Sequence, residues 1–232
     1  MLYDQPRLRP VGDTGILVEY GDAIDPEINL KIRVVALALE REKPAGIVEV
    51  IPSYRSLLIV YDPLETDLHS VELVLASVEG RLDRMRIPPP RTIHIPVLYA
   101  GESGPDIEFV ARFHGLRVED VIRIHSATIY RIYMIGFTPG FAYLGGLSAQ
   151  LHTPRLDTPR PVVRAGSVGI ANNQTGIYPV DSPGGWRLIG RTPLKVFDPD
   201  KKVPFLYRAG DLIKFTAVSK SSFMRIERGG AV

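Results

Sequence analysis

The 232-residue chain contains no cysteine, which excludes disulfides, thiol nucleophiles and thiolate metal sites. It has no run of about 18 apolar residues, and the stretch from Met1 to Pro10 lacks the apolar core of a signal peptide. Lys and Arg total 28 against 26 acidic residues, and this net charge of +2 gives no long-range field that would attract nucleic acid. We therefore expect a cytoplasmic protein that binds neither nucleic acid nor membrane.

Several catalytic and cofactor motifs are also missing. No two of the five histidines have the i, i+3 or i, i+4 spacing of a helical metal site, so the sequence predicts no bound metal. Neither a Gly-x-x-x-x-Gly-Lys-Ser/Thr run nor a Gly-x-Gly-x-x-Gly run between a strand and a helix is present, which argues against a nucleotide bound by this chain. The absence of a Gly-x-Ser-x-Gly elbow argues against acyl-enzyme chemistry.

The first part of the chain alternates strand and helix patterns. Apolar residues recur at helical spacing from Pro26 to the residue before Pro44, and again over residues 68–82. Residues 8–11, 16–20, 47–51 and 57–61 are rich in strand-forming residues. Two amphipathic helices on a small sheet predict a ferredoxin-like α/β sandwich over residues 1–87, followed by a stiff proline-rich linker at 88–91.

The remaining residues, 92–232, predict a second domain and an α+β protein overall. Residues 93–98 form an expected strand, and helical stretches follow around 106–113 and 118–125. From residue 130 onward, short apolar runs alternate with Gly and Pro, which is typical of a closed β-barrel or sandwich. We expect this part to be β throughout and residues 228–232 to be a frayed tail.

Three blocks at 136–146, 165–176 and 182–192 are crowded with Gly, Pro, Asn, Ser and Thr, and loops of such specified geometry commonly carry recognition. Their polar and aromatic side chains suit a small polar molecule with a carboxylate or amide, or a protein interface. Arg164 and Arg191 are candidates to pair with an anion. The predicted binding residues are His125, Thr138, Phe141, Tyr143, Arg164, Ser167, Gln174, Thr175, Tyr178, Ser182, Trp186 and Arg191.

Structural roles compete with binding at several of these positions. His125 lies at the end of a predicted helix, where a capping or half-buried histidine is common. Phe141 also suits the core, and arginines on barrel surfaces are usually solvated. The serines lack a positioned base, so no catalytic residue is assigned.

Residues 136–146, 165–179 and 182–192, together with Ile124-His125-Ser126 and residues 156–160, closely resemble the family of 5-oxoprolinase B subunits, also called the KipI or allophanate hydrolase subunit 1 family. The resemblance spans essentially the whole chain. It implies an N-terminal α+β domain followed by a cyclophilin-like β-barrel. It also implies a protein, inactive alone, that opens 5-oxoproline to L-glutamate with an A subunit (LamB/YcsF-like) and a C subunit (allophanate hydrolase subunit 2/KipA-like). The complex would use ATP, while this chain would bind no cofactor.

The resemblance leaves two other functions open. One is a regulatory protein that inhibits a sensor histidine kinase, and the other is the carboxyltransferase-type module of a urea carboxylase/allophanate hydrolase system. Asn172-Asn173 stands where the family often has small residues, and Arg164 where it has proline, so the substrate is open too. The arginine and aromatic pattern of a cyclophilin active site is missing, and a shared fold does not imply a shared activity.

Overall fold

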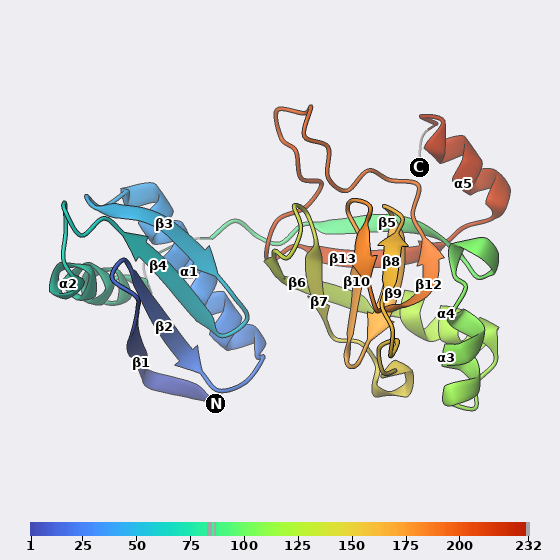
Figure 1. Ribbon diagram of the computed structural model, residues 1–232, viewed down its shortest axis with the longest axis horizontal. Helices are drawn as coiled ribbons and strands as arrows, with labels where there is room; N and C mark the ends of the chain where they lie inside the picture. The colour runs from blue at the N-terminus through green and yellow to red at the C-terminus, as the bar shows by residue number, and fades with distance from the viewer. Residues whose placement is uncertain (83–84, 86, 231–232) are drawn as a thin grey trace. The chain divides into compact units, whose positions relative to one another are not determined.

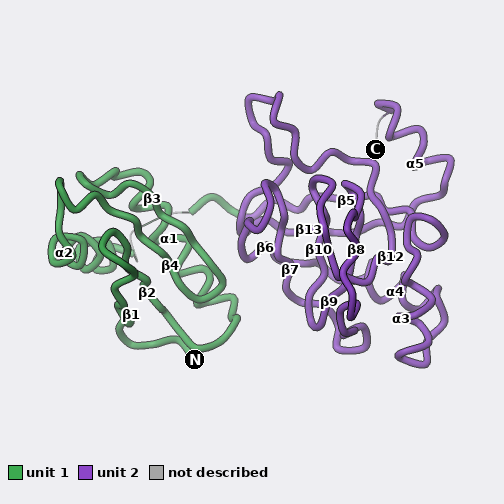
Figure 2. The backbone as a smooth tube through the Cα atoms, in the orientation of Figure 1, with its two compact units in different colours: residues 1–89 green, residues 90–232 purple. Residues whose placement is uncertain are grey.

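The computed structural model describes residues 1–82, 85 and 87–230, which fall into two compact units, residues 1–89 and 90–232 (Figure 2). The first unit is a four-stranded antiparallel sheet with the strand order β1-β2-β4-β3 and two helices packed on it (Figure 1). Its elements are β1 (Leu2–Val11), β2 (Gly15–Gly21), α1 (Pro26–Glu42), β3 (Ile47–Pro52), β4 (Ser56–Tyr61) and α2 (Leu68–Glu79).

This arrangement confirms the ferredoxin-like sandwich. Strands β2 and β3 flank β4 and run antiparallel to it, with α1 as the crossover between them. The strand that would follow the second helix in a ferredoxin-like order is replaced by the N-terminal strand β1, which pairs with β2. The first strand starts at Leu2 rather than Leu8, because a register irregularity between Leu2 and Arg7 lets the polar residues before Leu8 join the ladder.

Local signals fix both helices of this unit. The Asp25 side chain caps α1 by accepting from the backbone N–H groups of Glu27 and Ile28, and Pro26 occupies the first turn. Helix α1 ends at Glu42, and the C-cap residue Lys43 has a left-handed φ of 43°. The Asp67 side chain caps α2 in the same way. The apolar faces of the two helices bury a core against alternate residues of β2 and β4, including Ile16, Val18, Tyr20, Leu57 and Ile59.

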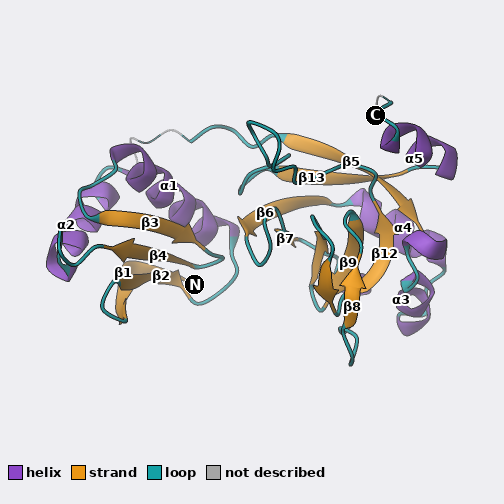
Figure 3. Ribbon diagram, turned by 45° about the horizontal axis from the view of Figure 1, so that its top comes forward, coloured by secondary structure: helices purple, strands orange, loops and turns teal. Residues whose placement is uncertain are grey.

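The second unit is a closed barrel of seven strands in the order β10-β7-β6-β13-β5-β12-β9, with β9 pairing back to β10 (Figure 3). A two-stranded sheet of β8 and β11 accompanies it. The strands are β5 (Thr92–Tyr99), β6 (Ile129–Ile135), β7 (Ala142–Gly145), β8 (Arg160–Val163), β9 (Ser167–Ala171), β10 (Gln174–Ile177), β11 (Ser182–Gly184), β12 (Arg187–Arg191) and β13 (Leu212–Ala217). The barrel confirms the predicted fold class.

Barrel closure brings together distant parts of the sequence. Strands β5 and β13 pair in parallel, with Thr92 opposite Leu212. The buried carboxylate of Asp211 accepts from the Arg91 backbone and guanidinium and from the Arg208 backbone N–H, at 2.5 to 3.2 Å. These bonds hold the pKa of Asp211 below its usual value although burial opposes them.

Helices α3 (Ile107–Phe113) and α4 (Val118–Ala127) follow β5 as the sequence predicts. A further helix, α5 (Lys220–Glu227), occupies residues that we expected to be β. Ser219 caps it, and Phe223 and Ile226, three residues apart, are its buried face, so the expectation of an all-β remainder was wrong here. Among the described residues, no helix combines the length and apolar character needed to cross a membrane.

Candidate functional site

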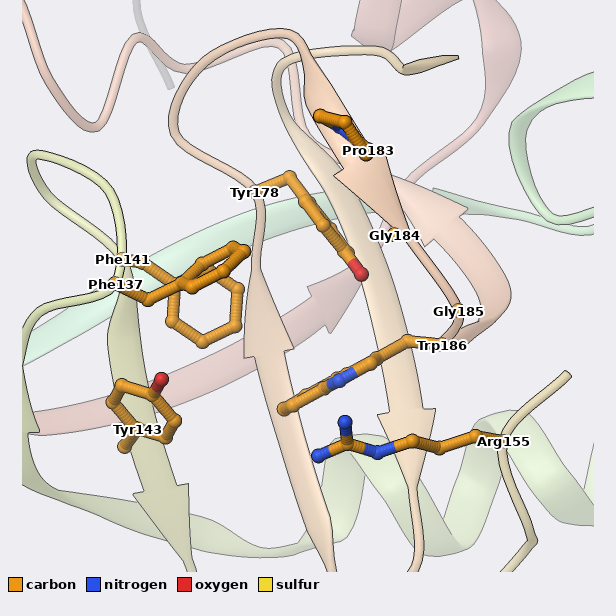
Figure 4. A pocket seen from close by; sticks show the side chains of 9 residues that line it. All are labelled: Phe137, Phe141, Tyr143, Arg155, Tyr178, Pro183, Gly184, Gly185 and Trp186. Atoms are coloured by element: carbon orange, nitrogen blue, oxygen red, sulfur yellow. The ribbon is translucent and has the colours of Figure 1, made fainter. Parts of the chain in front are cut away.

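An aromatic cavity of about 120 Å³ opens in the second unit, formed where the loops around β7, β10 and β11 meet (Figure 4). The Phe141 ring contacts three other rings that line the cavity. Its centroid lies 5.0 Å from that of Tyr143, 5.6 Å from that of Tyr178 and 5.4 Å from that of Trp186. All three pairs are T-shaped, a favourable geometry for aromatic rings. The lining residues are Phe137, Phe141, Tyr143, Arg155, Tyr178, Pro183, Gly184, Gly185 and Trp186.

Glycines in the sequence blocks make room for these rings. A Cβ at Gly176 would lie 3.1 Å from the Trp186 ring and 3.2 Å from the Phe141 ring, tighter than nine in ten real Cβ contacts. A Cβ at Gly184 would lie well under 3.0 Å from the Tyr178 hydroxyl oxygen, a distance that real Cβ atoms essentially never reach. Gly176 and Gly184, two of the glycines that marked these loops in the sequence, therefore serve aromatic packing around the cavity.

A buried ion pair holds the backbone that carries Trp186. Asp106, which is 8% exposed, pairs with Arg160 at 2.9 Å and accepts from the Leu188 backbone N–H at 2.7 Å. Arg160 in turn donates to the Trp186 carbonyl oxygen at 3.5 Å. Because both partners also bond the backbone on either side of residue 187, they fix the edge of the cavity at Trp186.

Arg155 brings the positive charge of the cavity. Its side chain extends beside the Trp186 ring, with the guanidinium carbon 6.0 Å from the ring centroid (Figure 4). No carboxylate of the described residues forms an ion pair with it. The sequence did not single out Arg155, although it directly precedes the segment 156–160 that carries part of the family resemblance.

Two tyrosine hydroxyls complete the polar lining. Burial raises the pKa of Tyr178, which the Trp186 backbone N–H and the nearby arginines Arg155 and Arg160 only partly oppose. Burial likewise raises the pKa of Tyr143 against the influence of Arg155. Both hydroxyls therefore stay protonated at neutral pH and are able to donate hydrogen bonds.

Three other predicted residues, Arg164, Ser167 and Arg191, line a separate groove of about 260 Å³. Arg191 donates to the Ala165 carbonyl oxygen at 3.1 Å and lies 3.6 Å from the Glu227 carboxylate of α5. The groove and the aromatic cavity share no lining residue. The structure therefore separates these arginines from the aromatic residues with which the sequence grouped them.

The structure places His125 and Thr175 inside the barrel, where both are 0% exposed. The Thr175 hydroxyl donates to the Gly169 carbonyl oxygen at 2.9 Å, so it accepts from His125 Nε2 at 2.9 Å. His125 Nδ1 then accepts from the Tyr99 hydroxyl at 2.8 Å. Burial lowers the pKa of His125 to about 3, so the ring is neutral, and every polar atom in this chain of bonds has a partner.

The last three predicted residues line neither hollow. Thr138 lies in the turn between β6 and β7, where its backbone accepts from the Phe141 N–H at 3.0 Å. Ser182 begins β11 and Gln174 begins β10. The hydroxyl oxygens of Thr138 and Ser182 are buried without a hydrogen-bond partner. Within the described part of the chain, no group of three or more His, Cys, Asp or Glu side chains could hold a metal ion.

Comparison with known proteins identifies the class of domain to which this chain belongs. Residues 6–207 match the family model described as carboxyltransferase domain, subdomain C and D. The urea amidolyase of Saccharomyces cerevisiae is 27% identical over 91% of this chain, which corresponds to 13% of that larger protein. The two halves of the fold therefore recur together as one module in a longer chain.

Shorter relatives match at higher identity. The B subunit of 5-oxoprolinase from Bacillus subtilis is 40% identical over 94% of this chain and 95% of its own length. The protein of the same name from Haemophilus influenzae is 46% identical over 78% of this chain and 84% of its own. A conserved uncharacterized protein from Pyrococcus horikoshii, known from a crystal structure, is 49% identical over 94% of this chain and 100% of its own, with a TM-score of 0.56. The chain belongs to the family of 5-oxoprolinase B subunits.

Proposed function

We propose that this chain is the B subunit of an ATP-dependent 5-oxoprolinase, which opens 5-oxoproline to L-glutamate together with an A and a C subunit. The observation that carries the proposal is the nearly full-length similarity, at 40% identity, to the 5-oxoprolinase B subunit of Bacillus subtilis. The aromatic cavity supports it, since its volume of about 120 Å³ suits a small ring and its lining combines apolar walls with a few polar groups.

The side chains at the cavity suit binding more than proton transfer. Its polar lining consists of an arginine and two tyrosines whose pKa values are raised, and none of these is a base at neutral pH. Opening a lactam requires activation of a resonance-stabilised amide, which ATP would supply by phosphorylating the amide oxygen. The contribution of this chain is then to orient the ring and exclude water, and the partner subunits complete the reaction.

The decisive experiment measures ATP-dependent glutamate release from 5-oxoproline by this chain mixed with candidate A and C subunits, with each component omitted in turn. We expect glutamate and phosphate to appear together only when all three are present. Full activity without this chain would overturn the proposal and favour the regulatory alternative, an inhibitor of a sensor histidine kinase.

A glycine variant connects this activity to the cavity. Gly184→Ala forces a Cβ against the Tyr178 hydroxyl and should lower glutamate release at least tenfold, because small displacements in a site have large kinetic effects. Gly80→Ala is the matched control, since Gly80 lies at the end of α2 and its nearest new contact would be 3.5 Å away. Equal activity of the two variants would remove the cavity from the reaction.

The similarity to urea amidolyase supports a second candidate, a carboxyltransferase-type module. This function predicts transfer of a carboxyl group from an activated carboxyl donor to urea, with no dependence on 5-oxoproline. The same mixtures, supplied with urea and such a donor in place of 5-oxoproline, separate the two functions. Formation of carboxylated urea, together with no glutamate release in the 5-oxoproline assay, would establish the second candidate instead of the first.

A further inference from the structure

We propose that the aromatic cavity binds the five-membered lactam itself, and that Arg155 pairs with the carboxylate of the lactam. This inference rests on the proposed function, because it takes 5-oxoproline as the substrate. It assigns the ligand to the aromatic cavity rather than to the groove that contains Arg164, Ser167 and Arg191.

The state of Arg155 is the first support. The neighbouring arginines are already engaged: Arg160 pairs with Asp106 at 2.9 Å, and Arg187 lies 3.7 Å over the Phe109 ring and donates to the Pro154 carbonyl oxygen at 3.3 Å. Arg155 lines the cavity without a carboxylate partner among the described residues. A guanidinium beside an apolar cavity attracts an anion, and its planar fork fits a carboxylate with two parallel hydrogen bonds.

The walls of the cavity are the second support. Phe141 and Trp186 are 2% and 6% exposed, and their rings stand at 89° to one another. Two rings at a right angle form a corner, which holds a small flat ring more closely than a flexible chain. The ring of a lactam has apolar methylene groups on one side and a planar amide on the other, so it matches apolar walls with a polar edge.

The hydroxyl of Tyr178 is the third support. Its side chain lines the cavity, and burial keeps its pKa above the usual value, so the hydroxyl retains a proton that it can donate. A lactam carbonyl oxygen accepts such a bond. With the carboxylate at Arg155 and the carbonyl oxygen at Tyr178, the two ends of the substrate are distinguished, and one orientation of the ring is selected.

The chain supplies its own optical probe for this site. Trp186 is its only tryptophan and lines the cavity, so tryptophan emission reports on the cavity alone. We expect L-5-oxoproline to change this emission saturably, and 2-pyrrolidinone, which lacks the carboxylate, to bind about tenfold to a hundredfold more weakly. Arg155→Gln should abolish this preference, Arg155→Lys should restore part of it, and Arg112→Gln, on the exposed surface of α3, should preserve it.

The reconstituted complex gives a second readout, for the case in which the cavity is completed only by a partner subunit. In the complex, Arg155→Gln should raise the KM for 5-oxoproline at least tenfold with a smaller change in kcat. An emission change that is equal for both ligands, or no emission change together with an unchanged KM in the Arg155→Gln complex, would overturn the assignment.

These outcomes are separate from the failure of the proposed function. If the complex releases glutamate only with this chain present, but Arg155→Gln alters neither emission nor KM, the role in the complex stands and the site lies elsewhere. If L-5-oxoproline binds in a carboxylate-dependent manner while the complex is fully active without this chain, the site stands and the role in the complex falls.

Discussion

The two faces of strand β10 border regions of different character, a hydrogen-bonded network inside the barrel and the aromatic cavity outside it. Thr175 of β10 points into the barrel and bonds His125, whereas its neighbour Gly176 faces the other side, beneath Phe141 and Trp186. Successive residues of a strand point to opposite faces, so one residue of register separates the interior network from the aromatic cavity. Inside, the ring nitrogens of His125 and the hydroxyls of Tyr99 and Thr175 are all paired. In the cavity, Arg155 has no carboxylate partner among the described residues.

The comparison teaches where chemistry is available. A polar network that is complete and shielded from solvent has no unpaired donor or acceptor for a ligand. Its effect is on the stability and shape of the barrel. A charge at the edge of an apolar cavity remains hydrated, and a ligand can replace its bound water. Burial and hydrogen-bond saturation thus distinguish His125, inside the barrel, from Arg155, at the cavity.

The largest expected effect is the loss of the interior ring. His125→Ala should lower the free energy of unfolding by about 3–4 kcal/mol, because it leaves a cavity in the barrel and removes the partner of the Tyr99 hydroxyl. Urea denaturation measures this loss, with His69→Ala as the control because the His69 side chain is 77% exposed. A loss below about 1 kcal/mol would show that the network does not stabilise the barrel.

Over the tested range of pH 4.5 to 6.5, the pH dependence of stability should come next. The pKa of His125 is about 3 in the folded chain and near 6.5 when unfolded, so below pH 6.5 the unfolded state binds the extra proton. The free energy of unfolding should therefore fall as the pH drops from 6.5, by up to about 1.4 kcal/mol per unit. The loss should level off below pH 3.

Asp67, Asp120 and Asp211 have lowered pKa values, so the stability they add is lost only below their usual pKa of 3.8. Between pH 4.5 and 6.5, His125→Gln should thus remove this slope in urea denaturation, while His69→Gln should keep it. Parallel pH profiles of the wild type and His125→Gln would contradict a neutral buried ring.

A smaller effect is expected at the support of the cavity. Asp106→Ala leaves the Leu188 N–H and Arg160 without their buried partner and should cost about 2–3 kcal/mol. It should also shift the Trp186 emission, because Arg160 loses its anchor beside Trp186. Asp157→Ala, at an exposed position, is the control for both measurements. An unshifted emission spectrum would mean that the ion pair supports the fold without positioning Trp186.

The smallest effect is expected at the mouth of the cavity. Phe137 is 70% exposed and has a φ of 69°, a left-handed conformation that is costly for an aromatic residue. Phe137→Asn should raise the free energy of unfolding by about 0.5 kcal/mol, because asparagine tolerates this conformation better. The same variant should weaken 5-oxoproline binding in the emission titration. A loss of stability above about 1 kcal/mol would instead show that the ring packs the core.

The sequence predicted elements well where a periodic apolar pattern coincided with a cap. Helix α1 has both, with Asp25 before Pro26 and a buried face from Ile28 to Leu39. Helix α5 has only eight residues and two buried side chains, so its period is too short to recognise, and Ser219 was the one signal available. The extension of β1 to Leu2 depends on pairing with β2, which no local pattern encodes.

For the site, composition predicted the region of the chain but not that its residues divide between a cavity, a groove and the barrel interior. The glycine blocks pointed to Phe141, Tyr143, Tyr178 and Trp186, which the structure brings together around one cavity. Arg155 escaped notice because a single arginine in a loop has no periodic or motif signal, and its position beside the Trp186 ring depends on the folded chain. His125 and Thr175 are 50 residues apart, so only the closed barrel shows that they bond each other.

The parallel pairing of β5 with β13 has a consequence for how the chain folds as it is made. The ladder joins Thr92 to Leu212, and the bond between Arg91 and Asp211 spans 120 residues. During synthesis the barrel cannot close until residue 217 has left the ribosome, whereas the sheet of the first unit is complete by Tyr61. For most of translation, the ribosome therefore carries a folded N-terminal unit and an unclosed barrel whose strand edges are exposed, and this interval is when the chain is most prone to aggregate.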